Sequence, residues 1–71
     1  MDKAKFKSVM VLHGETQGRL AEALEMAQET LSRKLNDQGE FSQSEIKAIK
    51  NRYHLTPEEV DAIFFKVSAS N

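Results

Sequence analysis

The chain has 71 residues, enough for one domain with one small hydrophobic core. Its net charge of −1 argues mildly against a sequence-independent nucleic-acid binder, because such a protein needs a large excess of Lys and Arg. The absence of cysteine excludes disulfides and thiolate metal sites. There is no long apolar run and no signal-peptide pattern, so a single cytoplasmic domain over residues 1–71 is expected, with no role at a membrane.

Helical spacing of apolar residues dominates the first half of the chain, and no segment alternates convincingly as a strand. Asp2 and Thr16 are expected to cap the first two helices, and Gly14 supplies the stop between them. After a break at residues 25–26, a third helix is expected over about residues 27–35. The residues expected to face inward are Phe6, Val9, Met10, Leu20, Ala21, Leu24, Leu31 and Leu35.

The second half contains clear helix start signals. Residues 36–41 are expected to form a turn-rich linker that pivots at Gly39. Ser42 opens the motif SQSE, a capping box, and residues 56–59, TPEE, supply a cap, a first-turn proline and two acids. Two more helices follow, and the tail, about residues 67–71, is expected to fray. Their expected inner residues are Ile46, Ile49, Tyr53, Val60, Ile63 and Phe64.

The stretch QGRLAEALEMAQETLSRKLN, residues 17–36, resembles the helix-turn-helix of the Cro/CI (lambda-repressor-like) DNA-binding family. Gln17 stands where the family often opens its second helix, and Ala21 where the two motif helices touch. One helix before the motif and two after it match the family's layout, so the resemblance covers most of the chain. It implies a compact, all-α, five-helix fold, nearest to the small phage-type members. The apolar positions that set the angle between the motif helices are Leu20, Leu24, Met26 and Leu31.

The sequence departs from the family pattern in three ways, at four positions. Glu25 replaces the usual glycine of the turn, so the backbone there must avoid or accept a left-handed residue. Ala27 replaces the Ser or Thr that often caps the recognition helix. Met10 and Leu35 occupy the positions of a buried Arg–Glu pair. Because apolar replacement of such a pair is often neutral or stabilising, these two side chains are expected to touch.

In this family the third helix lies in the major groove. The resemblance implies that Gln28 pairs with adenine, that Arg33 reaches guanine or a phosphate, and that Glu29 accepts from cytosine. Alternatively, this face is only solvated, and Glu29 pairs with Arg33 one turn on. The implied base-contacting residues are Gln28, Glu29, Ser32 and Arg33. The implied contacts to the DNA backbone are Thr16, Gln17, Lys34, Asn36 and Gln43.

The expected function is therefore a sequence-specific transcriptional regulator of phage Cro/CI type, which binds double-stranded operator DNA as a homodimer. The alternative is an antirepressor that keeps the fold and binds a phage repressor protein, a reading favoured by the acidic Glu25 and Glu29. No enzyme activity, cofactor or metal is expected. The chain has no glycine-rich phosphate loop and no nucleophile–base pair, and its two histidines lack ligand spacing.

The pair Phe64 and Phe65 predicts the contact surface of the dimer. In a regular helix two adjacent side chains point about 100° apart, so both cannot enter the core of so small a domain. Phe65, with Ile63 or Val67, is expected to form an exposed patch that a second copy or a repressor covers.

Overall fold

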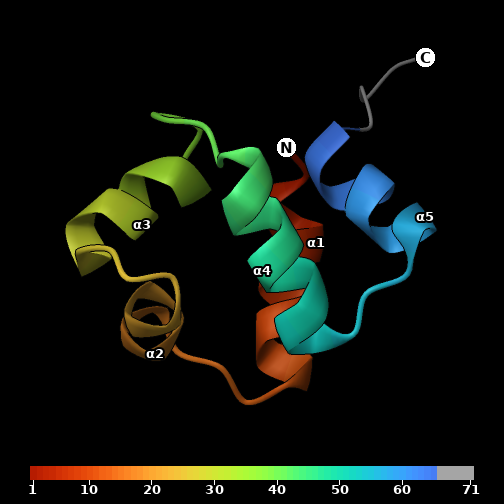
Figure 1. Cartoon of the computed structure of the whole chain (residues 1–71), viewed down its shortest axis with the longest axis horizontal. Coiled ribbons are helices and arrows are strands. Elements are labelled where there is room, and N and C mark those ends of the chain that lie inside the picture. The colour runs from red at the N-terminus through yellow and green to blue at the C-terminus, as the bar shows by residue number, and fades with distance from the viewer. Residues whose placement is uncertain (66–71) are drawn as a thin grey trace.

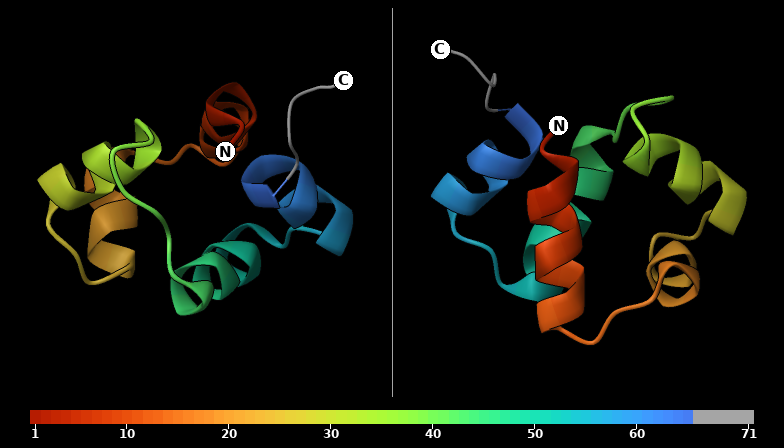
Figure 2. Two further views of the ribbon diagram at one scale, coloured as in Figure 1. Left: turned by 90° about the horizontal axis from the view of Figure 1, so that it is seen from above. Right: turned by 180° about the vertical axis from the view of Figure 1, so that it is seen from behind.

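A computed structural model describes residues 1–65 of the chain, and these residues are helical with no strand (Figure 1). The expected all-α class is thereby confirmed. Two further views show α1 and α4 on opposite sides of the centre, with the α2–α3 pair at one end and α5 at the other (Figure 2). No described helix has the length and apolar character needed to cross a membrane. The helices are α1 (Lys3–Leu12), α2 (Gln17–Ala23), α3 (Gln28–Leu35), α4 (Gln43–Tyr53) and α5 (Pro57–Val60), which continues as a π-helical turn, η1 (Asp61–Phe65).

Helix starts follow the expected side-chain caps. Asp2 accepts a hydrogen bond from the Lys5 amide at 3.0 Å, and Thr16 accepts one from the Arg19 amide at 3.1 Å. Both predicted caps are confirmed. Ala27 begins α3 without any side-chain hydrogen bond, as its methyl group requires.

Two capping boxes begin α4 and α5. In the first, Ser42 accepts from the Glu45 amide, and the Glu45 carboxylate accepts from the Ser42 amide. Thr56 and Glu59 repeat this pattern at α5, where Pro57 is the first helical residue. Each box satisfies two amides that the helix leaves unpaired.

The first four helices end in the same way, with one left-handed residue after the helix. These residues are Gly14, Glu25, Asp37 and His54, with φ values between 56° and 63°. In each case the next amide donates to a carbonyl five residues back, which closes the helix end. The turn-rich linker after α3 thus has its left-handed residue at Asp37, and Gly39, the expected pivot, lies in the bend that follows. The closing bonds run from Glu15 to Met10, Met26 to Ala21, Gln38 to Arg33 and Leu55 to Lys50, at 2.8–2.9 Å.

The fifth helix differs from the regular helix that the sequence predicts. After Val60 the backbone widens into the π-turn η1, which buries Ile63 to 1% exposure and leaves Phe65 50% exposed. The predicted exposure of Phe65 is confirmed. Ile63 belongs to the core, so its assignment to the exposed patch is wrong. Val67 and the tail, about residues 67–71, lie outside the described residues.

The core joins all five helices. Phe64 covers one side of it, with its ring 5.6 Å from those of Phe6 and Phe41 in edge-to-face arrangements. Leu24 and Val9, expected inward, are only partly buried. Met10 and Leu35 are both core members, and their direct contact stays a prediction. The buried apolar residues are Phe6, Met10, Leu20, Ala21, Leu31, Leu35, Ile46, Ile49, Tyr53, Leu55, Val60 and Ile63.

Candidate nucleic-acid interface

The exposed face of α3 carries the residues expected to contact bases. Leu31 and Leu35, 0% and 2% exposed, hold the opposite side of this helix against the core. Because side chains one turn apart share a helix face, the anchored side leaves one polar face outward. That face contains Gln28, Glu29 and Arg33, which are exposed, and Ser32, which is partly buried.

Glu29 and Arg33 form an ion pair across one turn of α3. The Arg33 Nη2 atom donates to the Glu29 carboxylate at 3.2 Å. Both side chains are largely exposed, so the pair contributes at most a few tenths of a kcal/mol and can open easily. The pairing expected for a solvated helix face is therefore present, and a base contact by Arg33 has to compete with it.

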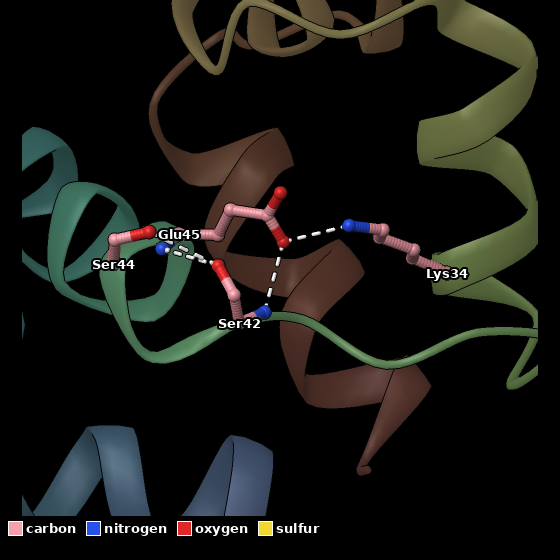
Figure 3. Close-up of polar contacts among 4 residues, drawn as sticks. All are labelled: Lys34, Ser42, Ser44 and Glu45. Carbon is pink, nitrogen blue, oxygen red and sulfur yellow. Dashed lines mark hydrogen bonds and ion pairs between the residues drawn. The ribbon is translucent and has the colours of Figure 1, made fainter.

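Lys34 points away from this face toward α4. Its ammonium lies 2.7 Å from the Glu45 carboxylate, which also accepts from the Ser42 amide (Figure 3). The ammonium also lies 5.8 Å from the centroid of the Phe41 ring. Burial raises the pKa of Glu45, but the hydrogen bonds from Lys34 and Ser42 outweigh it and lower that pKa overall. The implied phosphate contact by Lys34 does not fit this geometry, because the side chain instead joins α3 to α4.

Asn36 closes the end of α3 and joins it to α1. Its Oδ1 atom accepts from the Lys3 ammonium at 2.5 Å, and its Nδ2 atom donates to the Ser32 carbonyl at 2.9 Å. Both polar atoms of the side chain are thus in use. Gln43, also implied as a backbone contact, is exposed at the start of α4.

The start of α2 lies beside the start of α3. A Cβ atom placed on Gly18 would be 3.6 Å from the Gln28 Oε1 atom, so the Gln28 side chain lies next to the first turn of α2. Gln17, one residue earlier, is partly buried, and the Thr16 hydroxyl caps this turn. The fold therefore brings the expected backbone-contacting turn and the first expected base-contacting side chain together.

The loop before α2 is held in place by a polar cluster. The sequence did not predict this cluster. The Glu15 side chain, 5% exposed, accepts from the Arg52 guanidinium and from the Tyr53 hydroxyl, the latter at 2.6 Å. The His13 ring lies 5.0 Å from the Tyr53 ring. The Arg52 hydrogen bond outweighs burial and lowers the pKa of Glu15. Burial, aided by the bond to Glu15, raises the pKa of Tyr53. No local motif marks this cluster, because Glu15 and Arg52 are 37 residues apart.

Glu15 is expected to make folding sensitive to acid. Because its pKa is lowered in the folded state, its stabilising contribution is complete above the ordinary value of 4.5 and is lost as pH falls through the folded value. Glu15→Gln removes this dependence. Urea melts of both proteins between pH 3 and 7 should show a constant stability difference above about pH 5 and a smaller one below it. Comparison with the variant separates the contribution of Glu15 to the pH dependence of stability from that of Glu45, whose pKa is also lowered. A stability difference that stays constant down to pH 3 contradicts this role.

Among residues 1–65, no three His, Asp or Glu side chains gather in a way that could hold a metal ion.

Comparison with family models, with curated proteins and with solved structures gave no match.

Proposed function

We propose that the protein is a sequence-specific DNA-binding transcriptional regulator of Cro/CI type, with α3 as its recognition helix. One observation carries this proposal: α2 and α3 pack as a short-turned helical pair whose second helix presents a polar face at one end of the molecule (Figure 1). Such a pair supports a helix-turn-helix, in which the second helix would enter the major groove.

The surrounding helices support a lambda-repressor-like arrangement. One helix precedes the α2–α3 pair and two follow it, as the resemblance implies. Ala21, the small residue between the motif helices, is 3% exposed, and its carbonyl accepts the Met26 amide that closes the turn. Glu25 adopts the left-handed conformation for which the family uses glycine, at a cost of about 1 kcal/mol. The left-handed turn that the resemblance implies is therefore compatible with Glu25.

The chemistry of the α3 face fits reading bases better than attracting phosphates. Gln28 matches the donor and acceptor of adenine, and Arg33 matches the two acceptors of guanine. The Glu29 carboxylate accepts a hydrogen bond from a cytosine amine once Arg33 has left the ion pair and contacts a neighbouring base. Because the one described ion pair on this face cancels its charge, little sequence-independent affinity is expected. Two copies on a palindromic site, with recognition helices about 34 Å apart, supply the missing affinity.

Selection of bound sequences from random duplex DNA, at low and at physiological salt, tests the proposal. We expect one palindromic motif to be enriched at both salt concentrations. The matched control is the triple variant Gln28→Ala, Ser32→Ala and Arg33→Ala, which leaves the core untouched and should enrich no motif. No duplex binding by the folded wild-type protein at low salt contradicts the proposal.

A protein-binding role is the second candidate, in which the chain acts on a phage repressor. It is favoured by the exposed carboxylates of Glu25 and Glu29, both close to where DNA would lie. Each of these charges opposes the approach of a phosphate. A folded protein that binds no duplex would make this candidate the better one.

A further inference from the structure

The α2–α3 pair is joined to the other helices by two linkers, residues 13–16 before α2 and residues 36–42 after α3 (Figure 1). At the α3 end, three separate polar contacts reach other parts of the chain, so no single side chain is needed to hold it. These contacts join Lys34 to Glu45, Asn36 to Lys3, and Asp37 to the amino group of Met1.

The α2 end is held differently. Within residues 1–65, every hydrogen bond or ion pair between a side chain of this end and another helix runs through Glu15. The Glu15 carboxylate accepts from Arg52 Nη2 at 3.0 Å and from the Tyr53 hydroxyl at 2.6 Å. Both donors belong to the last turn of α4, whose end lies beside the end of α1 (Figure 1). Loss of one carboxylate therefore releases the α2 end, whereas the α3 end has three contacts.

Glu15 directly precedes the residues expected to meet the DNA backbone. Thr16 caps α2 and Gln17 is its first residue, so no further loop residue separates them from Glu15. The Glu15 amide also donates to the Met10 carbonyl at 2.8 Å, which fixes the backbone on the other side. Because charge-assisted hydrogen bonds to a buried carboxylate are strong and directional, Glu15 sets where α2 begins relative to α4.

We propose that Arg52 and Tyr53 are positioning residues for DNA binding, which act through Glu15 to hold the start of α2 where Gln17 contacts the DNA backbone. Their role rests on the proposed function and adds α4 to the helices on which that function depends. Since a backbone contact carries no sequence information, loss of either residue should weaken binding to every duplex by the same factor. Base preference should stay unchanged.

Glu15→Gln separates this role from a direct attraction between Arg52 and a phosphate. The variant removes a negative charge and releases Arg52, so it would tighten binding if Arg52 only attracted phosphate. If Glu15 positions α2, the variant instead weakens binding to the selected duplex and to its single-base variants alike, by about 3- to 10-fold at fixed salt. Tyr53→Phe removes only a hydroxyl and should act in the same direction.

Two further variants serve as controls in the same anisotropy measurement. Glu59→Gln makes the same chemical change in α5, where glutamine can retain the capping box, and it should not weaken binding. Gln17→Ala removes the contact that Glu15 positions. In that background Glu15→Gln should therefore cost less than about 2-fold.

Hydrogen exchange without DNA follows the start of α2 itself. The amides of Leu20, Leu31 and Ile46 occupy equivalent places, because each donates to the cap carbonyl of its helix, at 2.9–3.1 Å. In Glu15→Gln and in Tyr53→Phe, the Leu20 amide should exchange at least about 5-fold faster, with the other two changed by less than about 2-fold. A general loss of stability would accelerate all three alike.

The outcomes distinguish failure of this positioning role from failure of the proposed function. If the folded wild type binds no duplex, the proposed function fails and the role in DNA binding fails with it. If the wild type binds DNA but Glu15→Gln binds as tightly or more tightly, only the positioning role is overturned. An undiminished loss in the Gln17→Ala background, or equal acceleration of the three amides, also overturns it. Circular dichroism confirms that each variant is folded under the binding conditions.

Discussion

Leu35→Ala is expected to lower the free energy of unfolding by about 2–4 kcal/mol in urea melts. Leu35 is 2% exposed and lies in the last turn of α3, where it belongs to the core cluster with Leu31 and Met10. Truncation removes apolar contacts and leaves a cavity that the surrounding helices can fill only in part. A domain of this size has a small free energy of unfolding, so the loss should appear as a large shift of the urea concentration at the unfolding midpoint.

Leu12→Ala is the matched control for this prediction. It removes the same atoms from a side chain that is 81% exposed, so stability should change by no more than about 0.5 kcal/mol. If the two variants melt alike, Leu35 is not a core residue. The packing of α3, and with it the outward direction of Gln28 and Arg33, would then be wrong.

Gln28→Ala and Arg33→Ala are each expected to lose about 1–3 kcal/mol of discrimination at one base pair of the selected site. Each side chain offers two hydrogen-bonding groups, which a single base edge can satisfy in a bidentate pair. The loss should appear when affinity for the selected duplex is compared with affinity for its single-base variants. Fluorescence anisotropy at fixed salt gives both values.

Gln17→Ala provides the contrast, because a contact to the DNA backbone carries no sequence information. It should weaken binding to all duplexes by a similar factor and leave base preference unchanged. Equal, sequence-independent losses from all three variants would show that α3 docks on DNA without reading it. Glu29→Gln adds a further check, since it removes the carboxylate with which Arg33 pairs.

The sequence alone determined the features that depend on a few neighbouring residues. The caps at Asp2 and Thr16, the two capping boxes and the inward stripes of the helices could be predicted, because a cap acts over three residues and a stripe repeats every turn. The candidate base-contacting residues came from the resemblance to the Cro/CI family, and the burial of Leu31 and Leu35 on the other side of α3 leaves most of them exposed. These local signals gave an all-α protein with its helices in the right places.

The tertiary structure decided where the remaining polar and apolar side chains lie. Glu15 meets Arg52, and Lys34 meets Glu45, only because packing brings separate helices together. The same packing turns Lys34 away from the candidate DNA-binding face and leaves the Leu12 side chain exposed to solvent. Contacts between distant residues depend on how helices pack in three dimensions, and the spacing of residues along the chain carries no record of that arrangement.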